Sequence, residues 1–214
     1  MITIWGRDTS ANLQAVMWTA AEIGLAVERI DWGGKFGGND DPAYRAMAPH
    51  GKVPALRDGE LTLFESPAMV RYLAAAYGDE HFWPHSPAAR ADLDQWAEWA
   101  KTSLAFAIIN GVFVYTYRVK PSQQDPAEVA RLVAAASAEA RLADARIGDG
   151  PWLAGETFTW ADIMMGHMLY RWYEMPVERP TDTPNLDAYY KRLCARPAFA
   201  EHVMVPFEEL KAQD

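Results

Sequence analysis

The sequence predicts an α/β N-terminal domain followed by an all-α C-terminal domain. Short β-rich runs alternate with amphipathic helical segments over the first 80 residues. The segment HFWPHSP, with two prolines, then interrupts the pattern, and only helical patterns occur after it. We therefore expect an N-terminal domain over residues 1–80, a linker over 81–87 and a helical domain over 88–214.

The first domain is predicted to begin with a strand, a helix and a second strand. Residues 2–5 (ITIW) form a β-rich run, and apolar residues at helical spacing follow it as far as Gly24. LAVERID reads as the second strand, which a helical crossover makes parallel to the first. The remaining elements are a glycine-rich loop over 32–41, a short helix over 42–48, a hairpin over 53–64 and a helix over 67–77.

The hairpin, in HGKVPALRDGELTLF, contains a proline that a paired strand does not favour. Asp58-Gly59 suits a tight two-residue turn. Pro54 falls inside the first predicted strand, where it has no N–H to donate to a neighbouring strand. A cis bond between Val53 and Pro54 would turn the Val53 N–H and C=O outward, and an extended peptide could then pair with them.

The motif Glu65-Ser66-Pro67 precedes the next helix. Ser66 suits an N-cap and Pro67 suits the first turn, which explains the motif without any ligand. The free N–H groups of a helix start also bind carboxylates, and Glu65 beside them can pair with an ammonium group. With the edge at Val53, these residues predict a site for a small peptide that has a free α-amino acid end.

The second half of the chain carries helix signals throughout. Asp125-Pro126 and Thr159-Trp160-Ala161-Asp162 are N-terminal capping patterns, which are folding devices rather than catalytic groups. The predicted helices cover 88–118, a segment after Asp125, a segment after Thr159, and 185–195, where Pro197 follows.

Composition argues against several classes of protein. A formal net charge of −9 disfavours nucleic-acid binding. The single cysteine, Cys194, permits neither an internal disulfide nor a CxxC motif, and it reads as an incidental thiol. The N-terminus lacks an apolar signal core, and the uncharged run over 102–117 is shorter than the ~20 apolar residues of a spanning helix. We therefore expect a soluble cytoplasmic protein.

Two other sequence patterns do not predict a binding site. GGKFGG has neither the spacing nor the Ser/Thr of a phosphate-binding loop. His81 and His85 are four residues apart, but Pro84 between them disfavours a shared helical face, so no metal site is expected.

The string APHGKVPALRDGELTLFESPAMVRYLAAAYG resembles the glutathione-binding segment of the glutathione S-transferase family, and TWADI resembles its C-terminal folding motif. The resemblance covers essentially the whole chain and implies a thioredoxin-like first domain before the helical one. His50 stands where many relatives carry asparagine or another polar residue. The resemblance implies that the cysteine backbone of glutathione pairs with Val53, beside Pro54. The γ-glutamyl group then lies on Glu65 and Ser66, and the glycine end lies near His50 and Lys52.

The chemistry of this family is attack by the glutathione thiolate on an electrophile. Lowering the pKa of a thiol from ~8.5 by ~2 units takes about 2.7 kcal/mol. One hydrogen bond to the thiolate (~1.5–3 kcal/mol) and a helix N-terminus (~0.3–1 kcal/mol) suffice. The stretch GRDTSAN contains neither tyrosine nor cysteine, which points away from the classes that use them. Ser10 occupies the place of the activating serine in theta/delta-like classes, Asn12 and Thr9 stay open as alternatives, and Ser10 can also serve only as a helix cap.

The resemblance places the electrophile between the domains. Its candidate lining residues are Phe113, Tyr117 and Trp172, although such aromatics are more often core, and Arg118 is a candidate to attract an anionic co-substrate. The implied protein is a homodimeric glutathione transferase of detoxification that conjugates glutathione, its co-substrate, to a small apolar electrophile without a metal. The alternatives are a glutathione-dependent disulfide reductase or peroxidase that uses Asn12 or Thr9, and a non-catalytic interaction module of the same fold.

Overall fold

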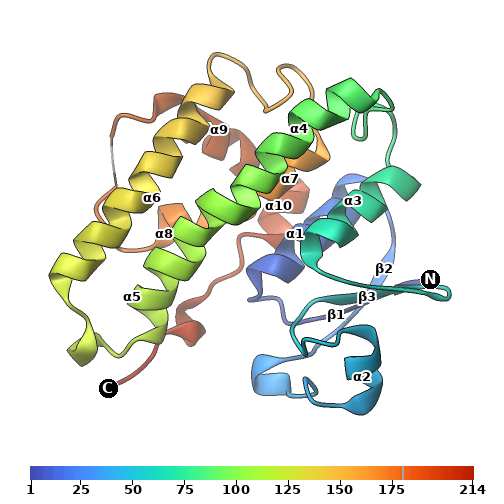
Figure 1. The fold of residues 1–214 in the computed structure, drawn as a ribbon, viewed down its shortest axis with the longest axis horizontal. Coiled ribbons are helices and arrows are strands. Elements are labelled where there is room, and N and C mark those ends of the chain that lie inside the picture. The colour runs from blue at the N-terminus through green and yellow to red at the C-terminus, as the bar shows by residue number, and fades with distance from the viewer. Residues whose placement is uncertain (180) are drawn as a thin grey trace.

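The computed structural model describes residues 1–179 and 181–214. A small sheet with its helices lies at one end of the molecule, and a bundle of helices forms the rest (Figure 1). The sheet has the strand order β2-β1-β3-β4, in which β1 and β2 are parallel and the other pairs are antiparallel. The predicted fold class is confirmed. The strands are β1 (Ile2–Trp5), β2 (Val27–Ile30), β3 (Ala55–Asp58) and β4 (Leu61–Phe64).

The alternation of side chains along the strands gives the sheet two buried faces. Ile4 and Leu56 belong to the main core, together with residues of α1 (Ala11–Glu22) and α3 (Ser66–Tyr77). Trp5 and Ala55 point the other way and join a smaller core with Tyr44 of α2 (Pro42–Met47). Helix α2 accordingly lies across the strands from α1 and α3 (Figure 1).

The hairpin and the helix after it differ in detail from the sequence prediction. Strand β3 begins at Ala55, so Pro54 precedes the strand instead of interrupting it. Asp58 pairs with Leu61, so the two loop residues are Gly59 and Glu60 rather than Asp58 and Gly59. Gly59 has a φ of 56°, which suits glycine at the first position of such a loop.

The N-cap of α3 is Glu65, and Ser66 is the first helical residue rather than the cap. The expected stop of the last predicted helix before Pro197 is correct, but Pro197 starts a further short helix instead of ending the helical structure.

The second half is helical, as predicted. Helix α4 continues through two π-helical stretches, Ala100–Leu104 and Phe106–Phe113, into α5. Together they form one long helical segment (Figure 1). The helices are α4 (Pro87–Trp99), α5 (Val114–Arg118), α6 (Pro126–Ile147), α7 (Trp160–Gly166), α8 (Leu169–Glu174), α9 (Pro184–Cys194) and α10 (Pro197–His202), with short 3₁₀ turns at Gly34–Phe36, Pro121–Gln123 and Glu208–Leu210.

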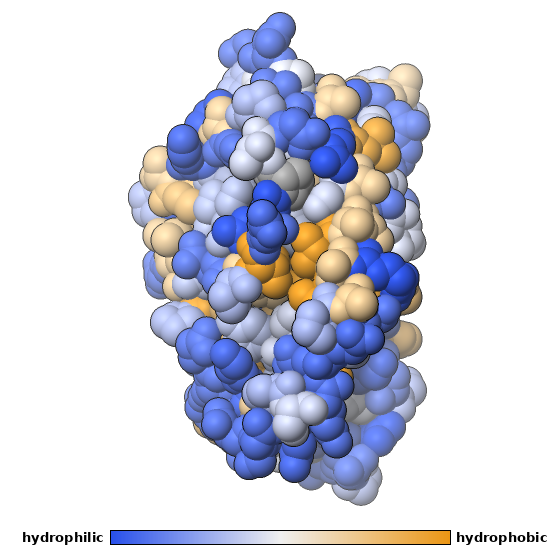
Figure 2. Space-filling view, turned by 90° about the vertical axis from the view of Figure 1, so that its left-hand side faces the viewer, coloured by the Kyte–Doolittle hydropathy of each residue, from blue (hydrophilic) through white to orange (hydrophobic). Residues whose placement is uncertain are grey.

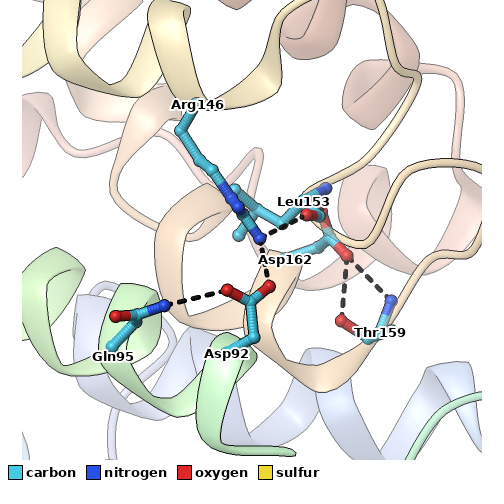
Figure 3. Close-up of polar contacts among 6 residues, drawn as sticks. All are labelled: Asp92, Gln95, Arg146, Leu153, Thr159 and Asp162. Carbon is cyan, nitrogen blue, oxygen red and sulfur yellow. Dashed lines mark hydrogen bonds and ion pairs between the residues drawn. The ribbon is translucent and has the colours of Figure 1, made fainter. Parts of the chain in front are cut away.

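The start of α7 holds a buried carboxylate. Asp162 forms a capping box with Thr159 and is fully buried. Its oxygens accept hydrogen bonds from the Thr159 N–H (2.8 Å) and hydroxyl (3.2 Å), from the Leu153 N–H (2.9 Å) and from the Tyr189 hydroxyl (3.1 Å). Burial raises the pKa of Asp162 to about 6 against these bonds, which lower it. Figure 3 shows this centre beside Arg146, which bridges Asp92 and the Leu153 carbonyl.

The face that α6 covers carries hydrophobic residues near its middle, surrounded by hydrophilic ones (Figure 2). A groove of about 530 Å³ lies between α6 and the segment after α8, lined in part by Val129, Val133 and Val177. No helix among the described residues is long and apolar enough to cross a membrane.

Candidate active site

Three loop segments meet at one edge of the sheet. Trp5 at the end of β1 pairs with Ala55 at the start of β3, and Ala55 pairs with Phe64 at the end of β4. The segment after β1, the segment before β3 and the segment after β4 therefore leave the sheet side by side. They carry all the predicted catalytic and glutathione-binding residues: Ser10 and Asn12 after β1, His50, Lys52, Val53 and Pro54 before β3, and Glu65 and Ser66 after β4.

Ser10 is the N-cap of α1 and is buried. Its Oγ accepts a hydrogen bond from the Leu13 N–H at 3.4 Å. A hydroxyl that accepts here still has its own O–H to donate. Ser10 therefore caps α1, the role that requires no ligand. Its hydroxyl also presents a hydrogen-bond donor beside the positive end of the helix.

The two alternatives to Ser10 also keep hydrogen-bonding capacity. Thr9 is buried, and its Oγ1 forms no well-aligned hydrogen bond with a described residue, although it lies near the Glu209 carboxylate. Asn12 is exposed, and its Oδ1 accepts a hydrogen bond from Lys101 Nζ at 3.0 Å. That bond leaves the Asn12 amide N–H groups free to donate. The geometry keeps both residues as candidates beside Ser10.

The segment before β3 contains the expected cis bond between Val53 and Pro54. Within the described part of the chain, the Val53 N–H and C=O have no hydrogen-bond partner. Lys52, the residue before Val53, is held in place by its neighbours. The Tyr44 hydroxyl donates to the Lys52 carbonyl at 2.8 Å, and the Lys52 N–H donates to His50 Nδ1 at 3.0 Å.

The segment after β4 presents a carboxylate and a hydroxyl at the start of α3. Glu65 has a φ of 72°, the one positive φ among the described non-glycine residues, and its side chain is 56% exposed. Ser66 is 4% exposed. His50 Nε2 lies 3.5 Å from Glu65 Oε1, and the His50 ring contacts the Phe64 ring edge to face. His50, on the neighbouring segment, thus lies beside the carboxylate of Glu65.

A cavity of about 270 Å³ opens between the first of these loops, the segment after β1, and the helical domain. Of the predicted electrophile-pocket residues, Phe113 and Arg118 line it, together with Ser10 and Asn12. Tyr117 does not: it is buried behind Phe113, stacked on that ring at 5.0 Å, with its hydroxyl donating to Glu208. Trp172 lines a different cavity, between α8 and α9.

Four titratable residues of the cavity were not predicted from the sequence: Arg7, Lys101, His167 and Arg171. Burial lowers the pKa of His167 to about 4, and the Lys101 charge adds to this effect, so the ring is neutral at pH 7. Burial also lowers the pKa of Lys101. Arg7 lies in the GRDTSAN stretch already singled out, whereas Arg171 lies within an aromatic run that reads as core.

No group of three or more His, Cys, Asp or Glu among residues 1–179 and 181–214 is arranged to hold a metal ion. Cys194 is partly buried on α9, and burial raises the pKa of its thiol, which makes it a weaker nucleophile.

Family profiles match both domains. A profile described as "Glutathione S-transferase, N-terminal domain" matches residues 1–75, and one described as "Glutathione S-transferase, C-terminal domain" matches residues 106–197. Glutathione S-transferase GstB of Escherichia coli is 38% identical over 208 residues, which cover 96% of this chain and 99% of that protein. Glutathione S-transferase F13 of Arabidopsis thaliana is 33% identical over 167 residues, or 74% of each chain.

Solved structures match the whole fold. A crystal structure of the theta class glutathione S-transferase from Xanthomonas axonopodis pv. citri with glutathione bound superposes with a TM-score of 0.89 and 43% identity. The superposition covers 96% of this chain and 98% of the other.

Proposed function

The chain belongs to the glutathione S-transferase family and is a glutathione transferase, and we propose that the three loops at the edge of its sheet hold glutathione with the thiol at Ser10. The observation that carries the proposal is the register Trp5–Ala55–Phe64, which brings the three segments together. Each segment then supplies a different kind of contact to an extended tripeptide.

The glutathione backbone and its two ends each have a partner of suitable chemistry. The Val53 N–H and C=O are positioned to pair with the cysteine residue of glutathione as an added strand. Ser66 and the first N–H groups of α3 suit the γ-glutamyl carboxylate, and Glu65 suits its ammonium group. Lys52 and His50 suit the glycine carboxylate. Glutathione is thus a co-substrate that needs no metal to bind.

The reaction we propose is nucleophilic substitution or addition by the thiolate. The thiol proton passes to solvent, and the sulfur electron pair forms a bond to an electrophilic carbon. In a substitution, the leaving group departs with the pair of electrons from the broken bond. The Ser10 O–H donates to the thiolate and, with the N-terminus of α1, favours ionisation of the thiol by a few kcal/mol.

The finer assignments rest on the family. We propose that the protein is cytoplasmic, that it acts in detoxification and that two copies form a homodimer. Sedimentation or light scattering tests the last point, because a dimer has twice the 23.9 kDa mass of the chain. The alternative activity of the same site, reduction of mixed disulfides or peroxides by the bound thiolate, is assayed on the same preparation.

Calorimetry and steady-state kinetics test the function. We expect glutathione to bind at millimolar concentration or below and the enzyme to conjugate it to an aryl or alkyl halide faster than the uncatalysed reaction. Binding without turnover of either halides or disulfides would leave the non-catalytic module as the correct description. Absence of binding would refute the assignment of the three loops.

A further inference from the structure

Three arginines come together in the cavity beside Ser10, each from a different part of the chain. Arg171 of α8 is 4% exposed, Arg7 after β1 is half-buried, and Arg118 at the end of α5 is exposed. They are close enough to repel one another. Burial together with the charges of Arg7 and Arg118 lowers the pKa of Arg171 to about 10, and burial with the Arg118 charge lowers that of Arg7.

Within the described part of the chain, none of the three arginines forms an ion pair with a carboxylate. The two acidic side chains whose charges act on Arg7 are Glu209 and Asp8. Each also has another partner: Glu209 pairs with Lys35 at 2.7 Å, and Asp8 accepts from the Thr9 N–H at 2.8 Å.

Among the groups that the structure describes, the pKa of Arg171 is affected only by burial and by the like charges of Arg7 and Arg118. Burying a charge in this way is unfavourable, and an anion in the cavity would offset that cost. The cavity is therefore positively charged, although the chain as a whole has a formal net charge of −9.

Arg171 is held rigidly in the cavity wall. Its guanidinium donates to the Thr9 carbonyl at 2.5 Å and lies over the Phe113 ring, 4.3 Å from the ring centre. Those contacts use part of a planar group that has five N–H donors. The remaining donors can meet a carboxylate, sulfonate or phosphonate in the forked arrangement that arginine favours.

The carboxylates of glutathione itself do not account for this cluster. The residues assigned to them, His50, Lys52 and Ser66, lie on the two loops at β3 and β4, and none of them lines the cavity. The arginines line it together with Ser10, where the thiol is placed. The positive charge of the arginines therefore lies in the part of the site that the electrophile must occupy.

We propose that the electrophile of this enzyme is an anion whose charged group binds to Arg171, Arg118 and Arg7 while its reactive carbon faces the thiolate at Ser10. The inference rests on the proposed function. It replaces the apolar electrophile expected from the sequence with a small organic acid. For a halo acid such as chloroacetate, the sulfur–carbon bond forms as the carbon–chlorine bond breaks, chloride leaves with the electron pair, and the carboxylate stays unchanged on the arginines.

Binding of two product analogues tests the proposal without turnover. S-(carboxymethyl)glutathione and S-(carbamoylmethyl)glutathione have nearly the same shape and differ by one negative charge. We expect calorimetry to show about tenfold or greater preference for the carboxymethyl compound, the scale of one charge-assisted hydrogen bond. Equal affinity for the two adducts would overturn the inference and leave the proposed function intact, whereas failure to bind glutathione or either adduct would overturn both.

Kinetics with chloroacetate and chloroacetamide identify the residues. Rates are expressed relative to the uncatalysed reactions, because the two halides differ in intrinsic reactivity. We expect Arg118→Gln, a change at an exposed side chain, to lower kcat/KM for chloroacetate about tenfold while leaving chloroacetamide and the KM for glutathione within about twofold. Arg131→Gln, the same change at an exposed arginine on α6, should alter none of these values.

The buried arginine gives the stronger test. Arg171→Gln should lower kcat/KM for chloroacetate by more than Arg118→Gln does, and Arg171→Lys should restore part of it because the charge returns. If Arg171→Gln fails to fold, Arg171→Lys and Arg118→Gln still decide the matter. An equal loss for chloroacetate and chloroacetamide in these variants would assign the arginines to the thiolate or to folding and would overturn the proposal.

Discussion

Among the described residues, two charged side chains are buried, Asp162 and Arg171, and their surroundings differ. Asp162, at the start of α7, receives hydrogen bonds from Thr159, Leu153 and Tyr189. Arg171, on the following helix, donates to one carbonyl, lies on an aromatic ring and faces a cavity with two more arginines. A buried charge whose hydrogen bonds are all satisfied internally stabilises the fold, while one with unused donors at a cavity is available to a ligand.

The largest effect that this comparison predicts is loss of stability at Asp162. Asp162→Ala leaves the buried N–H groups of Leu153 and Thr159 and the Tyr189 hydroxyl without acceptors. We expect the free energy of unfolding to fall by about 3–5 kcal/mol in denaturant titrations. Asp182→Ala removes a carboxylate that is 61% exposed and paired with Arg141, and it should cost about 1 kcal/mol or less. Similar losses in the two variants would contradict the contrast.

Ser10 belongs to the cavity, where the larger predicted effect of a substitution is on the reaction rate and the smaller one is on stability. Ser10→Ala should lower turnover about 10²-fold while the affinity for glutathione is kept, because one donor to the thiolate is lost. Ser86→Ala is the matched control: Ser86 caps α4 through Ala89 N–H at 3.5 Å, much as Ser10 caps α1. Both variants should lose about 1 kcal/mol of stability as caps.

The comparison with neighbouring donors decides which residue acts on the thiolate. If Ser10→Ala turns over normally and Asn12→Ala or Thr9→Val does not, the role passes to that residue. The buried hydroxyl of Thr9 and the amide of Asn12 are both close to the same helix start.

The pH dependence of stability tests how strongly the cavity shields His167. The unfolded chain binds a proton near pH 6.5, whereas folded His167 does so only near pH 4. Stability is therefore lost as the pH falls through this range, by about 2 kcal/mol from this residue between pH 7.5 and pH 5. Asp162, whose pKa is raised to about 6, acts in the opposite direction over part of the same range.

Because of this opposition, the measurement compares a variant with its parent. His167→Gln should remove the loss due to His167, so its free energy of unfolding should fall by about 2 kcal/mol less than that of the parent between pH 7.5 and pH 5. Parallel pH profiles would show that His167 takes up a proton normally in the folded state and that the cavity does not shield it.

The smallest effect expected concerns Glu65, a half-exposed carboxylate that belongs to neither buried centre. Glu65→Gln removes the charge that we assign to the glutathione ammonium group and keeps the size of the side chain. We expect the KM for glutathione to rise about tenfold, with kcat changed little. Glu60→Gln, at the hairpin loop, is the control. A fall in kcat with unchanged KM would place Glu65 near the reacting sulfur instead.

The architecture was predictable from the sequence because local signals and periodicity agree there. The βαβ order, the capping box at Thr159 and the cap at Asp125 all lie where the sequence placed them. Apart from the additional short helix that starts at Pro197, the errors are of one or two residues at boundaries, as at Pro54 and Ser66, where the pattern does not show which residue makes the last backbone hydrogen bond.

The site was predictable only where a contiguous motif carries it. The three loops each contain a recognisable stretch, so candidate residues could be proposed there from the sequence. Another part of the cavity wall comes from positions 101, 167 and 171, which no short motif connects. Trp172 and Arg171 are neighbours in sequence, yet they face different cavities, and helical phase alone does not show which one meets Ser10.

The backbone at Glu65 bears on any attempt to engineer this protein for heat tolerance. A φ of 72° favours glycine, so the usual rules of loop optimisation would replace Glu65 with glycine and gain up to about 1 kcal/mol. The same exchange would delete the carboxylate assigned to the tripeptide's amino terminus. Thermal stability would therefore favour glycine at position 65, whereas affinity for glutathione favours Glu65. A thermostabilised version should keep Glu65.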